Sequence, residues 1–218
     1  MKRTITVRGT GHASARPDSV VITMTLESKD RAYETAMQQA ERDIDALGEA
    51  LVGVGFEKSV LKTTNFAVRT NYESVRQPDG GYRQEFAGYV VCHDLKVEFD
   101  LTAALLSRTV TALGSCAAHP LLGIAFTVKD PETIRAELLR SAAENARQKA
   151  ELLCAASGVK LGELLHISYQ WNDAPFRSAT NCEVMADSAA RPRLAKAIAF
   201  EPEDVRVSDS ATFLWEIG

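Results

Sequence analysis

Residues 130–171 read DPETIRAELLRSAAENARQKAELLCAASGVKLGELLHISYQW and predict a long helix, a glycine stop and a strand. Asp130 can cap the first free amides of the helix, and Pro131 suits its first position. Glu132 adds a negative charge where the helix dipole is positive. Apolar residues then recur every three or four positions along one face: Ile134, Leu138, Ala142, Ala146, Ala150 and Leu153. Because much of this face is alanine, the helix can lie close to the element that it covers.

The end of the helix and the following strand are predicted by the same stretch. Gly158 can take the left-handed conformation that ends a helix. After it, alternation predicts a half-buried strand whose apolar face holds Leu165, Ile167, Tyr169 and Trp171. His166 lies on the other face, where an ordinary surface histidine is the simplest interpretation.

Similar patterns predict elements on both sides of this stretch. Two alternating runs, 66–72 and 89–99, flank Gln77-Pro78-Asp79-Gly80-Gly81 and predict an antiparallel hairpin. Gly9 and Gly11 follow a short first strand and predict a turn. The other expected elements are strands at 20–27, 122–128 and 205–217 and helices at 33–51 and about 101–113.

This order of elements predicts an α+β protein with a mostly antiparallel sheet and long helices packed on the sheets. Two β-α-β-β units emerge, one from the strand at 20–27 through the hairpin and the other from residue 121 to the carboxyl terminus. We therefore expect a single domain over residues 1–218, with two sub-units at 1–116 and 117–218.

Composition and charge narrow the class of protein. The chain is 45% hydrophobic and 25% charged, as in an ordinary globular protein, and it is long enough to bury a core. Its net charge of −4 and the lack of a basic run with aromatics argue against nucleic acid as a partner. No segment approaches the roughly 20 apolar residues of a membrane helix. The opening MKRTITVRGTGH lacks an apolar signal region, so we expect a cytoplasmic protein if Met1 is the native start.

Cysteine and histidine supply the candidates for chemistry. Cys92, Cys116, Cys154 and Cys182 are widely spaced, so we expect reduced thiols. Cys92-His93 and Cys116-x-x-His119 have zinc-ligand chemistry, but adjacent strand residues point to opposite faces, and we favour structural roles for all of them. No nucleophile motif accompanies the histidines. We assign no catalytic, cofactor-binding or metal-binding residue and expect no cofactor.

Residues 172–196 are rich in Ala, Ser, Asp and Asn and have no clear period. Segments of this length without secondary structure are uncommon in compact domains and are often functional. Phe176, between Pro175 and Arg177, could anchor the segment on its own chain or on a neighbouring subunit. We therefore expect an intersubunit contact at this segment, with Trp171, Phe176, Arg177 and Cys182 as candidate interface residues.

The whole chain resembles the SIMPL-domain (YggE-like) family. The resemblance rests on Ile5-Thr6-Val7-Arg8-Gly9-Thr10-Gly11, on Ala15-Arg16-Pro17-Asp18, on Leu61-Lys62-Thr63 before the hairpin and on the closing Val205-Arg206-Val207. The most specific match is the alanine-rich run at 142–151 followed by Gly158-Val159-Lys160-Leu161-Gly162. The resemblance implies bacterial proteins, mostly secreted or envelope-associated and linked to oxidative-stress tolerance, some of which form ring-like homo-oligomers. It implies no enzymatic activity, cofactor or catalytic residue.

These observations favour a non-enzymatic SIMPL-domain protein that acts as a homo-oligomeric binding or scaffold module, with no nucleic-acid partner and no membrane span. The ligand, if there is one, is not predicted. Two alternatives stay open. One is a cytoplasmic hydrolase or thiol-dependent enzyme with a scattered Cys, His and acid site around Cys92, His93 or His166. The other is a zinc-stabilised fold.

Overall fold

The computed structural model describes residues 3–78, 80–170, 176–180, 182–184 and 201–218. By proximity of Cα atoms the chain forms two compact units whose segments alternate along the sequence. Unit 1 is drawn from 1–18, 126–179 and 202–218, and unit 2 from 19–125 and 180–201. These groupings do not test the expected division after residue 116, which stays a prediction.

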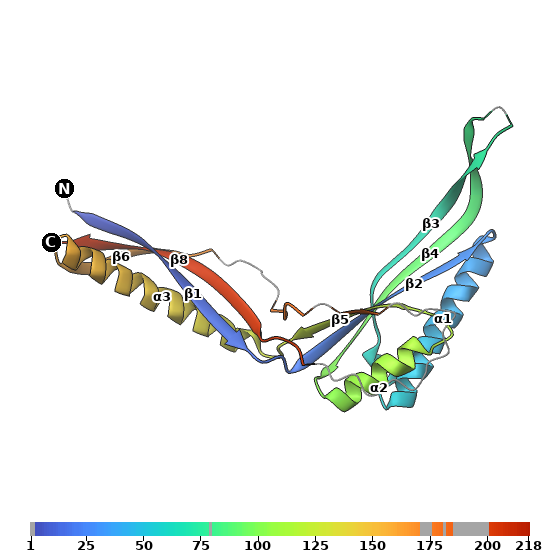
Figure 1. Cartoon of the computed structure of the whole chain (residues 1–218), viewed down its shortest axis with the longest axis horizontal. Coiled ribbons are helices and arrows are strands. Elements are labelled where there is room, and N and C mark those ends of the chain that lie inside the picture. The colour runs from blue at the N-terminus through green and yellow to red at the C-terminus, as the bar shows by residue number, and fades with distance from the viewer. Residues whose placement is uncertain (1–2, 79, 171–175, 181, 185–200) are drawn as a thin grey trace. The chain divides into compact units, whose positions relative to one another are not determined.

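Unit 1 is a three-stranded antiparallel sheet with one long helix. The strand order is β1 (Thr4–Ala15), β8 (Val205–Ile217) and β6 (Leu161–Ser168), and α3 (Pro131–Ala156) lies along the sheet (Figure 1). The predicted alanine face of α3 is confirmed, except that its last buried residue is Cys154 and Leu153 is exposed. It packs on a cluster formed by Val7, Ala211, Phe213 and Trp215.

The expected turn at Gly9 and Gly11 is wrong, because β1 runs straight through both glycines. A Cβ atom at Gly9 would lie 2.0 Å from the carbonyl oxygen of Ala142, and one at Gly11 would lie 2.0 Å from that of Leu138. The glycines are therefore needed because α3 approaches the backbone of β1, and not because the chain turns.

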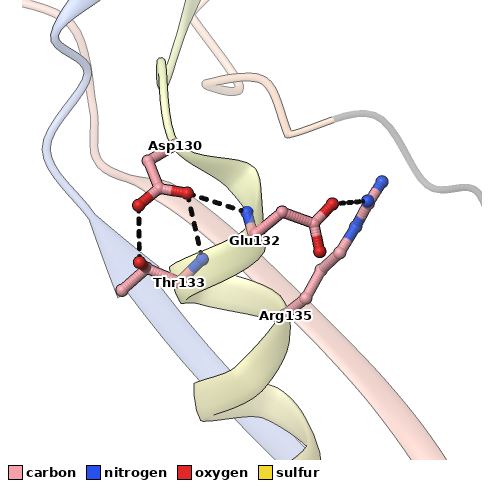
Figure 2. Close-up of polar contacts among 4 residues, drawn as sticks. All are labelled: Asp130, Glu132, Thr133 and Arg135. Carbon is pink, nitrogen blue, oxygen red and sulfur yellow. Dashed lines mark hydrogen bonds and ion pairs between the residues drawn. The ribbon is translucent and has the colours of Figure 1, made fainter.

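Asp130 caps α3 as predicted. Its Oδ1 accepts hydrogen bonds from the amides of Glu132 (3.1 Å) and Thr133 (3.2 Å), and the hydroxyl of Thr133 donates to Oδ2 (2.5 Å), as Figure 2 shows. The hydrogen bonds from Thr133 hold the pKa of the Asp130 carboxyl below its usual value. An ion pair between Glu132 and Arg135 adds to this first turn. Gly158, at φ 70°, follows the end of the helix as expected.

Unit 2 contains the five-stranded sheet, in the order β3-β4-β2-β5-β7, and two helices. The elements are β2 (Ser19–Asp30), α1 (Tyr33–Val54), η1 (Lys58–Val60), β3 (Lys62–Arg76), β4 (Tyr82–Asp100), α2 (Ala103–Gly114), β5 (Leu121–Thr127) and β7 (Cys182–Val184). α1 buries Ala36, Ala40, Leu47 and Leu51 and packs on β2, β4 and α2. It ends at Gly55, at φ 113°.

The predicted hairpin is confirmed and is longer than expected. β2 ends at Asp30, opposite Tyr89, and beyond that point β3 and β4 pair with each other and with no other described strand (Figure 1). The β3–β4 register shifts between Asn71 and Tyr72, where β4 supplies one extra residue. A Cβ atom at Gly88 would lie 2.4 Å from the carbonyl oxygen of Asp30, so only glycine fits where β2 stops.

The α+β class with antiparallel strands is therefore confirmed, in two sheets. In unit 1, the third strand of the sheet that contains β8 and β6 is β1. The strand directly before α3 in the chain, β5, belongs to the other sheet. Within the described ranges, no helix has the length and apolar character to cross a membrane.

Candidate functional site

The predicted interface residues lie in different settings. Phe176 is buried among Ala13, Ile134, Leu138 and Val205, and the Arg135 guanidinium lies 5.4 Å from the centre of its ring. The sequence allowed Phe176 to pack on its own chain or on a neighbouring subunit, and in the structure it packs on its own chain.

The other three candidates are less defined. Arg177 is exposed and forms a β-bridge with Thr127. Trp171 falls outside the described residues, as does most of the predicted interface segment 172–196. Cys182 opens β7, but its side chain is not described. The interface role of these residues stays a prediction.

The described thiols do not converge. Cys116 and Cys154 are buried, Cys92 is half-buried, and all three are free. His119 is exposed at φ 46° in the turn after the buried Cys116, so these two side chains face different surroundings. Across the described part of the chain, no group of three or more His, Cys, Asp or Glu side chains lies close enough to hold a metal ion.

His93 is the most unusual polar side chain in unit 2. It is only 7% exposed, on the face of β4 that α1 covers, whereas Cys92 lies on the other face, as the strand pattern predicts. Its Nε2 lies 2.8 Å from the hydroxyl oxygen of Thr63, and its Nδ1 has no hydrogen-bond partner among the described residues. The Phe66 ring lies edge-on, with its centre 5.2 Å from that of the imidazole. Burial lowers the pKa of His93, so the neutral ring is favoured.

A hydroxyl beside an imidazole is the first half of a nucleophile–base pair. The second half is an acid that orients the other ring nitrogen, and the neighbouring carboxylate does not fill that role. Asp94 lies on the opposite face of β4, where Asn65 Nδ2 (3.0 Å) and Thr25 Oγ1 (2.7 Å) donate to it and lower its pKa. The contact between Thr63 and His93 therefore joins β3 to β4 but is not a catalytic triad.

Polar groups line several solvent-open depressions of the described structure, and two of these lie in different units. One, of about 350 Å³, lies in unit 2 between α1 and the start of β3, and Asp45, Glu49, Lys58 and Thr63 line it. The other, of about 390 Å³, lies in unit 1 and is lined by Arg8, Ser168, Gln170, Asp209, Ser210 and Thr212. Small-molecule sites are usually enclosed and mainly apolar, and these depressions are neither.

Residues of the unit 1 depression form side-chain hydrogen bonds. Arg8 donates from Nε and Nη2 to the hydroxyl of Ser210, at 2.9 and 2.6 Å. The Tyr169 hydroxyl donates to Asp209 Oδ2 at 2.8 Å, and burial together with this carboxylate raises the pKa of Tyr169 to about 12. Tyr169 is therefore a neutral hydrogen-bond donor here and not an acid or a base at neutral pH.

The outer strands are the more distinctive surfaces. β6 is the last strand of its sheet, and Leu164, Leu165 and Ile167 on it are 47%, 42% and 50% exposed. The expected half-buried face of this strand is wrong, because α3 lies mainly along β1 and β8, and two register shifts disturb the pairing of β6 with β8. β3 is likewise the last strand of the five-stranded sheet, and most of its side chains are exposed.

Comparison with known proteins identifies a family whose function is unknown. The family model described as SIMPL, protein of unknown function (DUF541), matches residues 5–215. No curated protein matches the chain. The match extends from β1 through β8 and thus includes both sheets and all three α-helices. The chain belongs to the SIMPL family.

Proposed function

We propose that this chain is a non-enzymatic SIMPL-domain protein that works as a homo-oligomer and binds partners or holds them as a scaffold. The observation that carries the proposal is the outer edge of β6, which pairs with β8 and with no other described strand. A link to oxidative-stress tolerance, implied by the family resemblance, is part of the same proposal.

β6 lacks the Lys and Pro residues that commonly protect a strand edge, although two register shifts disturb its pairing with β8. Free edges are commonly blunted by Lys, by Pro or by inward-pointing charges, because an open edge is a template for another strand. β6 reads LGELLHIS, with one acidic residue and no Lys, Arg or Pro. Burying half of a leucine or isoleucine side chain stabilises an assembly by about 1 kcal/mol. Leu164, Leu165 and Ile167 together therefore offer roughly 3 kcal/mol per subunit, which a second copy of the chain can gain.

The first test is the mass of the native protein, measured by light scattering on a sizing column under reducing conditions. We expect a discrete oligomer. Leu165→Lys should weaken association about tenfold or more, because it places a charge in the apolar contact. Leu139→Lys is the matched control, since Leu139 is similarly exposed on α3, and it should leave the mass unchanged. A monomeric wild-type protein at all concentrations would refute the proposal.

A histidine- or thiol-dependent enzyme is the second candidate. The observation in its favour is the 2.8 Å contact between Thr63 and His93 beside the unit 2 depression, which Thr63 lines. Hydrolysis of an activated ester such as p-nitrophenyl acetate would test it, with Thr63→Ala and Cys92→Ser as variants. Turnover that disappears in either folded variant would favour the enzyme. Turnover that is absent, or unchanged in both, would eliminate this candidate.

A further inference from the structure

The free edge of β3 carries a charge pattern that fits a second copy of itself. In antiparallel pairs, opposite residues either both point their N–H and C=O groups at the neighbouring strand or both point them away. Because these directions alternate along a strand, two identical strands can pair antiparallel only if facing residues are an even number of positions apart. These backbone directions alternate without interruption on β3 from Asn65 to Arg76. The bulge near Thr64 lies before this stretch, and the register shift at Asn71 adds its extra residue to β4 and not to β3.

Three charged residues lie on this stretch: Arg69, Glu73 and Arg76. Arg76 is three positions from Glu73 and seven from Arg69, so neither of these pairs can face in an antiparallel self-pairing. Arg69 and Glu73 are four positions apart and can. If Arg69 of one copy lies opposite Glu73 of the other, the register is fixed, and Asn71 lies opposite Asn71 of the second copy. The same register brings Arg76 opposite Phe66, an exposed ring on which a guanidinium can rest.

The environment of Glu73 supports an incoming positive charge. Glu73 lies directly opposite Glu85 on β4, and like charges at such positions disfavour the pairing. Arg31 is the one described basic residue that lines the same depression as these two carboxylates. Arg69 of a second copy would supply a second positive charge.

The ribbon that carries these residues also lacks support. Beyond Asp30 and Tyr89, no third strand of the described structure pairs with β3 or β4, and an isolated two-stranded ribbon is marginally stable. Tyr72 and Phe86 meet edge to face across it, with ring centres 5.9 Å apart, and both are exposed. A second ribbon along β3 would make this part of the sheet four strands wide.

We propose that β3 is a self-recognition edge, at which two copies of the chain pair antiparallel with Asn71 on the two-fold axis and Arg69 of each facing Glu73 of the other. This inference rests on the proposed homo-oligomer and names one of its contacts. The β3 contact would be a second interface beside the apolar one proposed at β6, and its register would be set by charged residues.

Cysteine cross-linking of the full chain tests the register. Opposite Cα atoms in antiparallel strands lie about 4.5–5.5 Å apart, within the range that a disulfide spans. Asn71→Cys should therefore give a disulfide-linked dimer on mild oxidation, above the background of the wild-type cysteines. Ser74→Cys is the matched control on the same edge. In the proposed register its two copies lie six residues apart, or about 20 Å, and should not cross-link.

Charge exchange tests the pairing itself by sedimentation analysis at low salt. Arg69→Glu and Glu73→Arg should each weaken association about tenfold, because each places like charges at two symmetry-related positions. The double variant restores both pairs and should return to within about threefold of wild type. Arg83→Glu on β4 is the control, because Arg83 is exposed on the same ribbon but not on the β3 edge. Circular dichroism checks the fold of each variant.

The outcomes separate the two proposals. An oligomer that forms while Asn71→Cys cross-links no better than Ser74→Cys, and that ignores the charge exchange, overturns the β3 inference and leaves the homo-oligomer standing. A chain that is monomeric at every concentration overturns both. Cross-linking of Asn71→Cys only to a different protein would assign the edge to another partner and also overturn the inference.

Discussion

The two outer edges of the unit 1 sheet are treated in opposite ways. At β1 the backbone amides of Thr10 and His12 donate to side chains of α3, namely Asn145 Oδ1 at 3.1 Å and Ser141 Oγ at 3.3 Å. At β6 no described helix or strand covers the edge. The helix that buries the sheet therefore also closes one of its edges, whereas no described element closes the other.

The comparison shows what closing an edge of this sheet requires. Closing β1 takes specific residues at matched positions on two elements, including the glycines under α3. Lys149 extends the closure by donating to the carbonyl oxygen of Arg8 at 3.2 Å. No comparable polar contacts are present along β6 in the described structure.

Gly9→Val, at the closed β1 edge, should cause the largest loss of stability. Valine favours strands, but its Cβ would lie 2.0 Å from the Ala142 carbonyl oxygen, and a backbone clash outweighs propensity. We expect the free energy of unfolding to fall by about 3 kcal/mol, measured by urea denaturation. Gly48→Ala on α1, where a Cβ meets nothing within 4 Å, should be neutral or stabilising. Equal losses in both variants would show that the close approach of α3 to β1 is not what demands glycine.

Asn145→Ala should open the β1 edge locally at a smaller cost. The Thr10 amide loses its acceptor, so we expect a loss of about 1 kcal/mol and faster hydrogen exchange at Thr10. Glu144→Ala, on the exposed face of the same turn, is the control. Unchanged exchange at Thr10 in Asn145→Ala would mean that this side chain does not close the edge.

Acid should destabilise unit 2 through the buried His93, with the smallest of the three effects. Burial lowers the pKa of His93 from its ordinary 6.5, so the unfolded chain takes up this proton more readily than the folded one. Stability from this group is therefore full above pH 6.5 and falls as the pH drops below it, by at most about 0.8 kcal/mol at pH 6. Urea denaturation at pH 7.5 and 6 would measure the loss, which should shrink in His93→Gln but not in the exposed control His166→Gln. The opposite sign, with acid stabilising the fold, would contradict the assignment.

Local patterns were enough to predict most elements. Asp130 and Gly158 delimit α3 because capping chemistry depends on a few neighbouring residues, and the hairpin followed from alternation around a turn-forming loop. What failed depended on distant segments. Gly9 and Gly11 suggested a turn because the approach of a helix more than 120 residues later cannot be read from the strand itself.

The candidate surfaces divide in the same way. Phe176 was singled out as a large apolar residue that could anchor its segment on its own chain or on a neighbouring subunit. Its neighbours come from three separate segments, so only the structure shows that it contacts its own chain. The exposure of Leu165 and Ile167 was missed because alternation predicts two faces and cannot tell whether a helix covers one of them. The contact between Thr63 and His93 had no sequence signal, since it depends on strand register across the hairpin.

The pairing of β1 with β8 has a consequence for how the chain is made. Thr4 lies opposite Glu216, and Ala15 lies opposite Val205, so this sheet joins the two ends of the chain. Unit 2 takes most of its residues from the continuous stretch 19–125, which leaves the ribosome early. β1 emerges before any of it but must wait for the last strand before it can pair, and such long-range pairing is slow. During synthesis, therefore, β1 stays without its β8 partner until residues 205–217 have been made.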